Sequence, residues 1–175
     1  MIFNETALPG AFIIELEAAE DERGSFARTF CEREFEAQGL NRRFVQCSLS
    51  VNARRGTLRG MHYQAEPHAE TKLVHCVRGA LFDVIIDLRP QSATYCRWFG
   101  VELSAANNTL LYVPEGFAHG FQTLEDDTAV YYQISAYYAP QSARGVRWND
   151  PAFAIKWPLT NPLVSDKDSE LPDYQ

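Results

Sequence analysis

Short strand-like runs separated by turn residues recur along most of this chain of 175 residues. The runs are rich in β-branched and aromatic residues, which favour extended structure. Arg78-Gly79 and Pro114-Glu115-Gly116 supply turns between neighbouring runs. About ten short strands at this spacing are typical of an antiparallel sandwich or barrel. The clearest expected strands cover residues 44–49, 73–77, 81–88, 98–103, 110–113, 120–124 and 129–135.

The remaining segments are less regular. Residues 32–38 (EREFEAQ) predict a short helix, because the following Gly39 suits a helix C-terminus. Roughly the first 30 residues are also strand-like and could pair with a second subunit. The proline-containing tail after Trp157 predicts an ordered but irregular wrap. No repeat or long linker divides the sequence, so we expect residues 1–175 to form one domain.

The charge balance restricts the possible partners. Sixteen Lys and Arg against 23 Asp and Glu give a net charge of −7, which argues against nucleic acid and anionic membranes as partners. The longest apolar stretches are strand-sized, and residues 1–20 carry no positive charge and no sustained apolar run. We therefore expect a cytoplasmic protein whose four scattered cysteines are reduced.

Three motifs of common enzyme classes are absent. The chain contains no G-x-G-x-x-G after a strand, no G-x-x-x-x-G-K-[ST] and no G-x-S-x-G. A dinucleotide oxidoreductase, a P-loop enzyme and a serine hydrolase are therefore disfavoured.

His62, in LRGMHYQ (58–64), is the first candidate for chemistry. A histidine among apolar residues is more often a hydrogen-bonded core residue, but an imidazole also suits proton transfer near neutral pH. A carboxylate on its far nitrogen would fix the tautomer and raise the basicity of the ring. Asp166 or Asp168 could supply that carboxylate if the tail folds back.

Basic and aromatic clusters suggest a small phosphorylated ligand. Arg59 could hold a phosphate and Lys72 could stabilise an oxyanion, although ordinary surface roles are the simpler reading of each residue alone. Tyr132 is by default a strand residue, but a tyrosine can also serve as a general acid. The basic cluster is Arg54, Arg55, Arg59 and Lys72, and the tyrosines that could stack on a base are Tyr131, Tyr132, Tyr137 and Tyr138.

The four histidines, His62, His68, His75 and His119, also raise the question of a metal site. Pro114-x-Gly116-x-x-His119 matches the second half of the metal motif of cupin-type barrels. Gln64 stands where the first half requires its second histidine. His62 and His119 alone would hold a transition metal poorly, so we expect no functional metal.

Taken together and in order, these segments resemble the dTDP-4-dehydrorhamnose 3,5-epimerase family. The resemblance covers nearly the whole chain, and VPEGFAHGF and RGVRWNDP are long enough to be specific. It implies an all-β, cupin-type double-stranded β-helix (jelly roll) with one or two short helices and an irregular C-terminal tail. The matching segments are DERGSF (21–26), FVQ (44–46), TLRGMHYQ (57–64), KLVHCVRGALFDVIIDLR (72–89), WFGVELSAANN (98–108), LYVPEGFAHGFQTL (111–124), YYQISAYYAP (131–140), GVRWNDP (145–151), IKWPL (155–159) and SDKD (165–168).

The resemblance implies an isomerase that acts on a nucleoside-diphosphate 4-keto-6-deoxy sugar. The C4 ketone acidifies the C3–H and C5–H bonds, so epimerisation requires a base, an acid on the opposite face and a cation near the C4 oxygen. By resemblance His62 is the base, which Asp168 orients, and Tyr132 is the acid. Lys72 stabilises the enolate oxygen. The positions that match substrate contacts are Arg23, Phe26, Gln46, Ser48, Arg59, His119 and Tyr138.

The family also implies a cofactor-free homodimer in which Arg23 and Phe26 reach the nucleotide of the partner subunit. Tyr138 matches a tyrosine that lies near the nucleobase and the diphosphate of the bound nucleotide. The chain departs from the family where Cys47-Ser48 replaces the usual Asp-Asn, and where Arg28 replaces a frequent glutamate. The positions of the base, its partner, the lysine and the acid are unchanged.

The implied reaction converts dTDP-4-dehydro-6-deoxy-D-glucose to dTDP-4-dehydro-L-rhamnose. The departures leave open a mono-epimerase acting at C5 or C3 of a dTDP- or CDP-linked 4-keto-6-deoxy sugar. A non-catalytic nucleotide-sugar-binding cupin and a metal-dependent cupin oxygenase are the alternatives from other classes.

Overall fold

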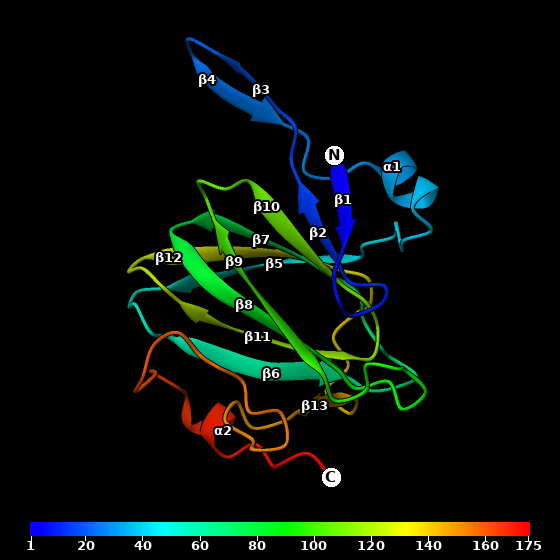
Figure 1. The fold of residues 1–175 in the computed structure, drawn as a ribbon, viewed down its shortest axis with the longest axis vertical. Coiled ribbons are helices and arrows are strands. Elements are labelled where there is room, and N and C mark those ends of the chain that lie inside the picture. The colour runs from blue at the N-terminus through cyan, green and yellow to red at the C-terminus, as the bar shows by residue number, and fades with distance from the viewer.

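Two antiparallel sheets pack face to face and form a jelly roll (Figure 1). The computed structural model describes residues 1–175. The larger sheet has the strand order β1-β2-β10-β7-β12-β5, and the smaller has the order β13-β6-β11-β8-β9. The all-β architecture with two short helices confirms the expected fold class.

The strand bounds are as follows. The six-stranded sheet contains β1 (Ile2–Glu5), β2 (Phe12–Glu15), β5 (Gln46–Asn52), β7 (Lys72–Arg78), β10 (Thr109–Val113) and β12 (Thr128–Ile134). The five-stranded sheet contains β6 (Leu58–Gln64), β8 (Ala80–Asp87), β9 (Trp98–Ser104), β11 (Phe117–Thr123) and β13 (Ala143–Gly145). A separate hairpin joins β3 (Ala18–Asp21) to β4 (Gly24–Ala27), and the helices are α1 (Glu32–Ala37) and α2 (Asp166–Ser169).

All seven strands named from the sequence are present, with ends shifted by up to three residues. The predicted helix is also present as α1, and Gly39 beyond its end has a φ of +69°. β6 was not among the expected strands, because polar side chains and Gly60 interrupt the β-branched pattern there. α2 lies in the tail that was expected to be irregular.

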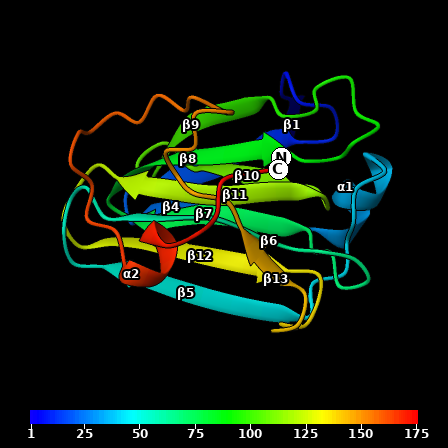
Figure 2. The ribbon, with the colours of Figure 1, turned by 90° about the horizontal axis from the view of Figure 1, so that it is seen from below.

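β8 is buried on both of its faces. Its inward residues, Leu81 and Ile85, belong to the core between the sheets. Val84 and Ile86 on the other face pack against residues of the C-terminal third, including Phe153. Figure 2 shows this C-terminal segment crossing the outer face of the five-stranded sheet. The expected wrap is therefore present, and it brings the end of the chain to β6.

The N-terminal strands complete the larger sheet of their own chain. β1 pairs with β2, and β2 pairs with β10, so β1 is the edge strand of that sheet, and its pairing with a second subunit stays a prediction. The β3–β4 hairpin instead projects away from the two sheets (Figure 1). No helix of the structure is long and apolar enough to cross a membrane, since the longer of the two has six residues.

Candidate active site

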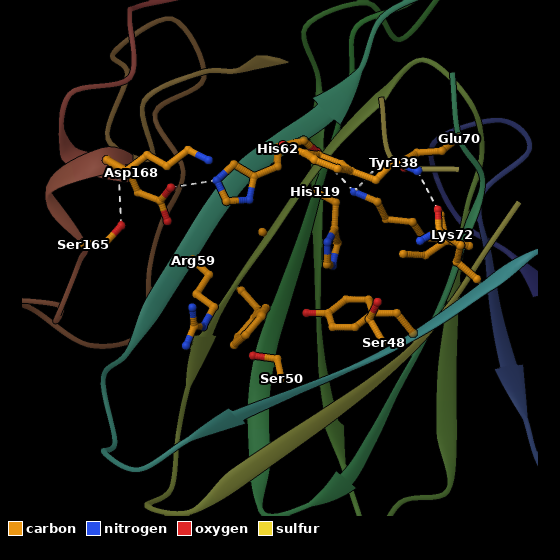
Figure 3. Close-up of a pocket in the computed structure, with 16 residues that line it drawn as sticks. Ser48, Ser50, Arg59, His62, Glu70, Lys72, His119, Tyr138, Ser165 and Asp168 are labelled. Carbon is orange, nitrogen blue, oxygen red and sulfur yellow. Dashed lines mark hydrogen bonds and ion pairs between the residues drawn. The ribbon is translucent and has the colours of Figure 1, made fainter. Parts of the chain in front are cut away.

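A polar cavity of about 520 Å³ lies between the two sheets, at the end of the barrel that α2 covers (Figure 3). Side chains of β5, β6, β7, β11, β12 and α2 line it. Nine of the eleven site residues named from the sequence converge here: Gln46, Ser48, Arg59, His62, Lys72, His119, Tyr132, Tyr138 and Asp168.

Two glycines bring β6 and β11 close enough to place two histidines side by side. A Cβ on Gly60 would lie 2.6 Å from the Cα of Gly120, and Gly60 has a φ of +129° that other residues rarely adopt. His62 and His119 are direct partners in the register of these strands. The glycines therefore permit the close strand approach on which the geometry of the cavity depends.

The tail supplies the carboxylate partner of His62. His62 Nε2 lies 2.7 Å from Asp168 Oδ1, and the backbone N–H of Gly60 donates to Asp168 Oδ2 at 3.3 Å. Ser165 caps α2 by accepting a hydrogen bond from the N–H of Asp168. The structure therefore places beside His62 the aspartate that the family resemblance names, Asp168, and not Asp166.

The Asp168 carboxylate favours one tautomer of the imidazole. Burial by itself raises the pKa of Asp168, but the hydrogen bond with His62 and the backbone N–H of Gly60 outweigh that effect, so the net pKa is below its usual value. An ionised Asp168 accepts a hydrogen bond from the N–H at Nε2 of His62. This leaves Nδ1 free to take a proton from a ligand.

Lys72 lies at the start of β7, nearly buried, with an acidic partner that the sequence reading missed. Its Nζ lies 3.0 Å from Glu70 Oε1 and 3.5 Å from the carbonyl oxygen of His62. The side chains of both ion-pair partners are nearly buried, at 11% and 12% exposed. The ammonium group is thus held between Glu70 and the backbone of His62.

Tyr132 extends from β12 in the opposite sheet and lies next to His119. The two ring centroids are 5.9 Å apart in an edge-to-face arrangement. Burial, followed by the negative charge of Asp83, raises the pKa of Tyr132 well above its usual value. The phenol is therefore protonated at neutral pH and has a proton to donate.

The positive charge at the cavity differs from the expected basic cluster. Arg59 lines the cavity and donates from Nε to Asn52 Oδ1 at 2.8 Å. Arg55 bonds instead to Asp126 and Leu124, and neither it nor Arg54 lines the cavity, so their inclusion in the cluster was wrong. Lys167, which the sequence reading missed, lines the cavity.

Arg23 and Phe26 are the two named residues outside the cavity. Both lie on the β3–β4 hairpin, where the Arg23 side chain is 84% exposed and pairs with Asp21. Phe26 is 80% exposed. Their expected contact with the nucleotide of a partner subunit stays a prediction.

Of the four histidines, His62 and His119 line the cavity, and His68 and His75 do not. His68 bonds to Ser142 Oγ at 2.9 Å, and His75 is absent from the lining of the cavity. No group of three or more His, Cys, Asp and Glu side chains is arranged to hold a metal ion.

Several lining residues were absent from the sequence reading. Ser50 follows Ser48 by two positions on β5, so strand alternation alone could have placed both on the inner face. No strand pattern could have predicted the other three. Glu70 reaches the cavity from the loop between β6 and β7, and the folded tail brings Ser165 and Lys167 there.

Comparisons with known proteins agree with the resemblance in the sequence. The family model described as dTDP-4-dehydrorhamnose 3,5-epimerase matches residues 5–175. A protein of that name from Shigella flexneri is 46% identical over 165 residues, which are 94% of this chain and 91% of the relative.

Solved structures give the same result. The dTDP-4-dehydrorhamnose 3,5-epimerase of Bacillus anthracis, with TDP and PPi bound, is 43% identical with a TM-score of 0.96, and the alignment covers 99% of both chains. The Legionella pneumophila dTDP-6-deoxy-D-glucose-3,5-epimerase, in complex with dTDP-4-keto-L-rhamnose, is 36% identical with a TM-score of 0.91, covering 99% of this chain and 98% of that one.

Proposed function

Since this chain belongs to the dTDP-4-dehydrorhamnose 3,5-epimerase family, we propose that it epimerises C3 and C5 of dTDP-4-dehydro-6-deoxy-D-glucose to give dTDP-4-dehydro-L-rhamnose. One observation of the site carries the proposal. The His62–Asp168 pair and Tyr132 belong to opposite walls of a single cavity that also contains Lys72.

His62 is the base that removes the proton from carbon. The C4 ketone acidifies the neighbouring C–H bonds, because the carbanion that forms at C3 or C5 delocalises into an enolate. Nδ1 of His62 accepts the proton while Nε2 remains bonded to Asp168 at 2.7 Å. Asp168 stabilises the imidazolium that results, as the carboxylate of a catalytic triad does.

Lys72 stabilises the enolate oxygen. Lys72 is buried, at 9% exposed, and its ammonium group lies 3.5 Å from the backbone carbonyl oxygen of His62. A charge in a poorly hydrated site stabilises a developing oxyanion more strongly than the same charge in water. Glu70, at 3.0 Å, holds the ammonium group in place.

Tyr132 donates the proton that inverts the carbon. β6, which carries His62, belongs to the five-stranded sheet, whereas β12, which carries Tyr132, belongs to the six-stranded sheet. A sugar bound between the sheets presents one face to the base and the other to the acid. Protonation from the face opposite to deprotonation changes the configuration.

The remaining cavity residues bind the nucleotide sugar. Arg59 and Lys167 supply positive charge for the diphosphate in a chain whose net charge is −7. Gln46 accepts a hydrogen bond from the backbone N–H of Tyr138, which positions that tyrosine at the mouth of the cavity. Ser48 and His119 line the sugar portion, and the reaction uses no metal or organic cofactor.

A cytoplasmic homodimer is the proposed assembly. The β3–β4 hairpin projects from the body and exposes Phe26 and Arg23, which fits contacts with a second copy (Figure 1). Leu49, Val51 and Val77 form an exposed apolar group on the outer side of the six-stranded sheet. Measurement of the mass in solution tests the dimer, and a monomer at micromolar concentration would contradict it.

Deuterium incorporation tests the proposed reaction directly. The protein is incubated in D₂O with dTDP-4-dehydro-6-deoxy-D-glucose, and NMR follows C3 and C5 of the sugar. Exchange at both carbons is the expected result. Exchange at one carbon would make the protein a mono-epimerase. No exchange would favour a different nucleotide sugar or a protein that only binds one.

A further inference from the structure

A second histidine–carboxylate pair lies beneath the cavity. His119 Nε2 is 2.7 Å from Asp83 Oδ1, and the two side chains are 5% and 0% exposed. Asp83 Oδ2 has no hydrogen-bond partner. A carboxylate buried in this way is costly unless a positive charge offsets it, and His119 is its one bonded partner. The arrangement therefore ties a buried carboxylate to a single histidine of the cavity.

A buried aspartate on this strand does not need a histidine as its partner. Asp87 lies four residues along the same strand and is equally buried, at 0% exposed. Its carboxylate accepts hydrogen bonds from Arg89, Ser92 and Thr94. Asp83 differs because one oxygen is left without a partner and the other faces a histidine of the active site.

The pair also adjoins the residue that needs a proton in each catalytic cycle. The ring of His119 contacts the ring of Tyr132, with centroids 5.9 Å apart. Burial and the charge of Asp83 raise the pKa of Tyr132, so the phenolate left after proton donation is strongly disfavoured. Two epimerisations require two such donations from the same tyrosine.

We propose that the Asp83–His119 pair is the proton source that reloads Tyr132 between the two epimerisation steps. The inference rests on the proposed function. As the new C–H bond forms, the O–H bond of Tyr132 breaks and its electron pair stays on the phenolate oxygen. The proton on Nδ1 of His119 then passes to that oxygen through the cavity, and the electron pair of the N–H bond stays on the ring.

The protons balance over the cycle. In each epimerisation His62 takes one proton from the sugar and releases it to solvent through the open cavity, while His119 takes one back from solvent, so two protons leave and two return over the full reaction. Asp83 acts as a positioning residue, because its bond to Nε2 fixes the ring of His119 with Nδ1 outside the pair.

Single-turnover kinetics of Asp83→Asn tests the proposal. Excess protein is mixed with the 4-keto sugar nucleotide, the reaction is quenched at intervals, and NMR separates singly from doubly epimerised sugar. We expect the second step to slow at least about tenfold more than the first, so that singly epimerised sugar accumulates. Added imidazole should restore the second step by supplying the missing proton.

Asp87→Asn is the matched control, because it alters an equally buried carboxylate of β8 outside the cavity. It should lower the unfolding temperature yet leave the ratio of the two rates unchanged. If Asp83→Asn fails to fold, His119→Gln provides the second test, since an amide can bond to Asp83 but has no proton to transfer.

Equal slowing of both steps in the variant, with no rescue by imidazole, would overturn the inference and leave the proposed function intact. Failure of the unaltered protein to exchange any sugar hydrogen would overturn the proposed function and the inference with it.

Discussion

Replacing Asp168 by asparagine removes the charge behind the proposed base and keeps the size of the side chain. When His62 accepts a proton from the sugar, its positive charge forms beside the Asp168 carboxylate, to which Nε2 is bonded at 2.7 Å. Two unit charges about 4 Å apart attract by about 4 kcal/mol at an effective dielectric constant near 20. Because the His62 side chain is 43% exposed, solvent screening reduces this contribution to about 2 kcal/mol.

A loss of about 2 kcal/mol in the transition state corresponds to a fall of about 30-fold in kcat. The assay is the rate of deuterium uptake at C3 and C5 under saturating sugar nucleotide. Asp166→Asn is the matched control, because Asp166 lies in the same short helix, is exposed and makes no contact with His62. We expect this control to retain the kcat of the unaltered protein.

The reasoning would be refuted by a kcat that falls less than about threefold in Asp168→Asn, because the carboxylate would then contribute less than about 1 kcal/mol. A rise in KM with an unchanged kcat would also refute it, since it would place Asp168 in ground-state binding instead of proton transfer.

Four further substitutions probe other parts of the site. Tyr132→Phe should lower kcat by about 10²- to 10⁴-fold and leave the Kd of dTDP unchanged in calorimetry; a large loss of affinity would make Tyr132 a binding residue. Glu70→Gln should lower kcat about tenfold through loss of the 3.0 Å contact with Lys72, whereas Glu66→Gln, which alters an exposed loop residue, should not; equal rates would contradict the positioning role. Gly60→Ala should destabilise the fold by more than about 3 kcal/mol in denaturant titrations, because its Cβ would lie 2.6 Å from Gly120 Cα, whereas Gly56→Ala, with open space around it, should cost about 1 kcal/mol. Ser48→Asn should lower KM about fivefold by adding one hydrogen bond, and Cys47→Asn should leave KM unchanged; no difference between the two would show that the side chain at position 48 does not reach the sugar.

The sequence predicted the strands best where β-branched and aromatic residues determine the pattern. β8 and β12 are rich in such residues, and both lie within one residue of their expected ends. β6 was not predicted as a strand, because Arg59, Gly60 and His62, which lie at the cavity, interrupt its run of β-branched and aromatic residues. The strand that carries the proposed base, β6, is therefore harder to predict from the sequence than β8 or β12.

The site was predictable to the extent that its residues lie on strands. Once the family resemblance fixed the register of the strands, His62, Lys72 and Tyr132 could be assigned to one cavity. The choice between Asp166 and Asp168 came from the family resemblance alone, because the two residues that meet at β6 are more than a hundred positions apart and no local pattern links them. Arg54 and Arg55 were misplaced for the opposite reason, since proximity in sequence to Arg59 does not put a turn residue on the inner face of a strand.

The alternation of side chains along a strand decides which departures from the family sequence can affect the choice of substrate. Ser48 faces the cavity and is the register partner of Tyr132, whereas Cys47, one residue earlier, is exposed and absent from the lining. Arg28 lies beyond β4 and pairs with Glu34 of α1, away from the cavity of its own chain. Of these three positions, only Ser48 changes the wall that contains Tyr132, the proposed acid. A serine there leaves a shorter side chain beside Tyr132 than the usual asparagine, so we expect differences in the number of epimerised centres to originate at position 48.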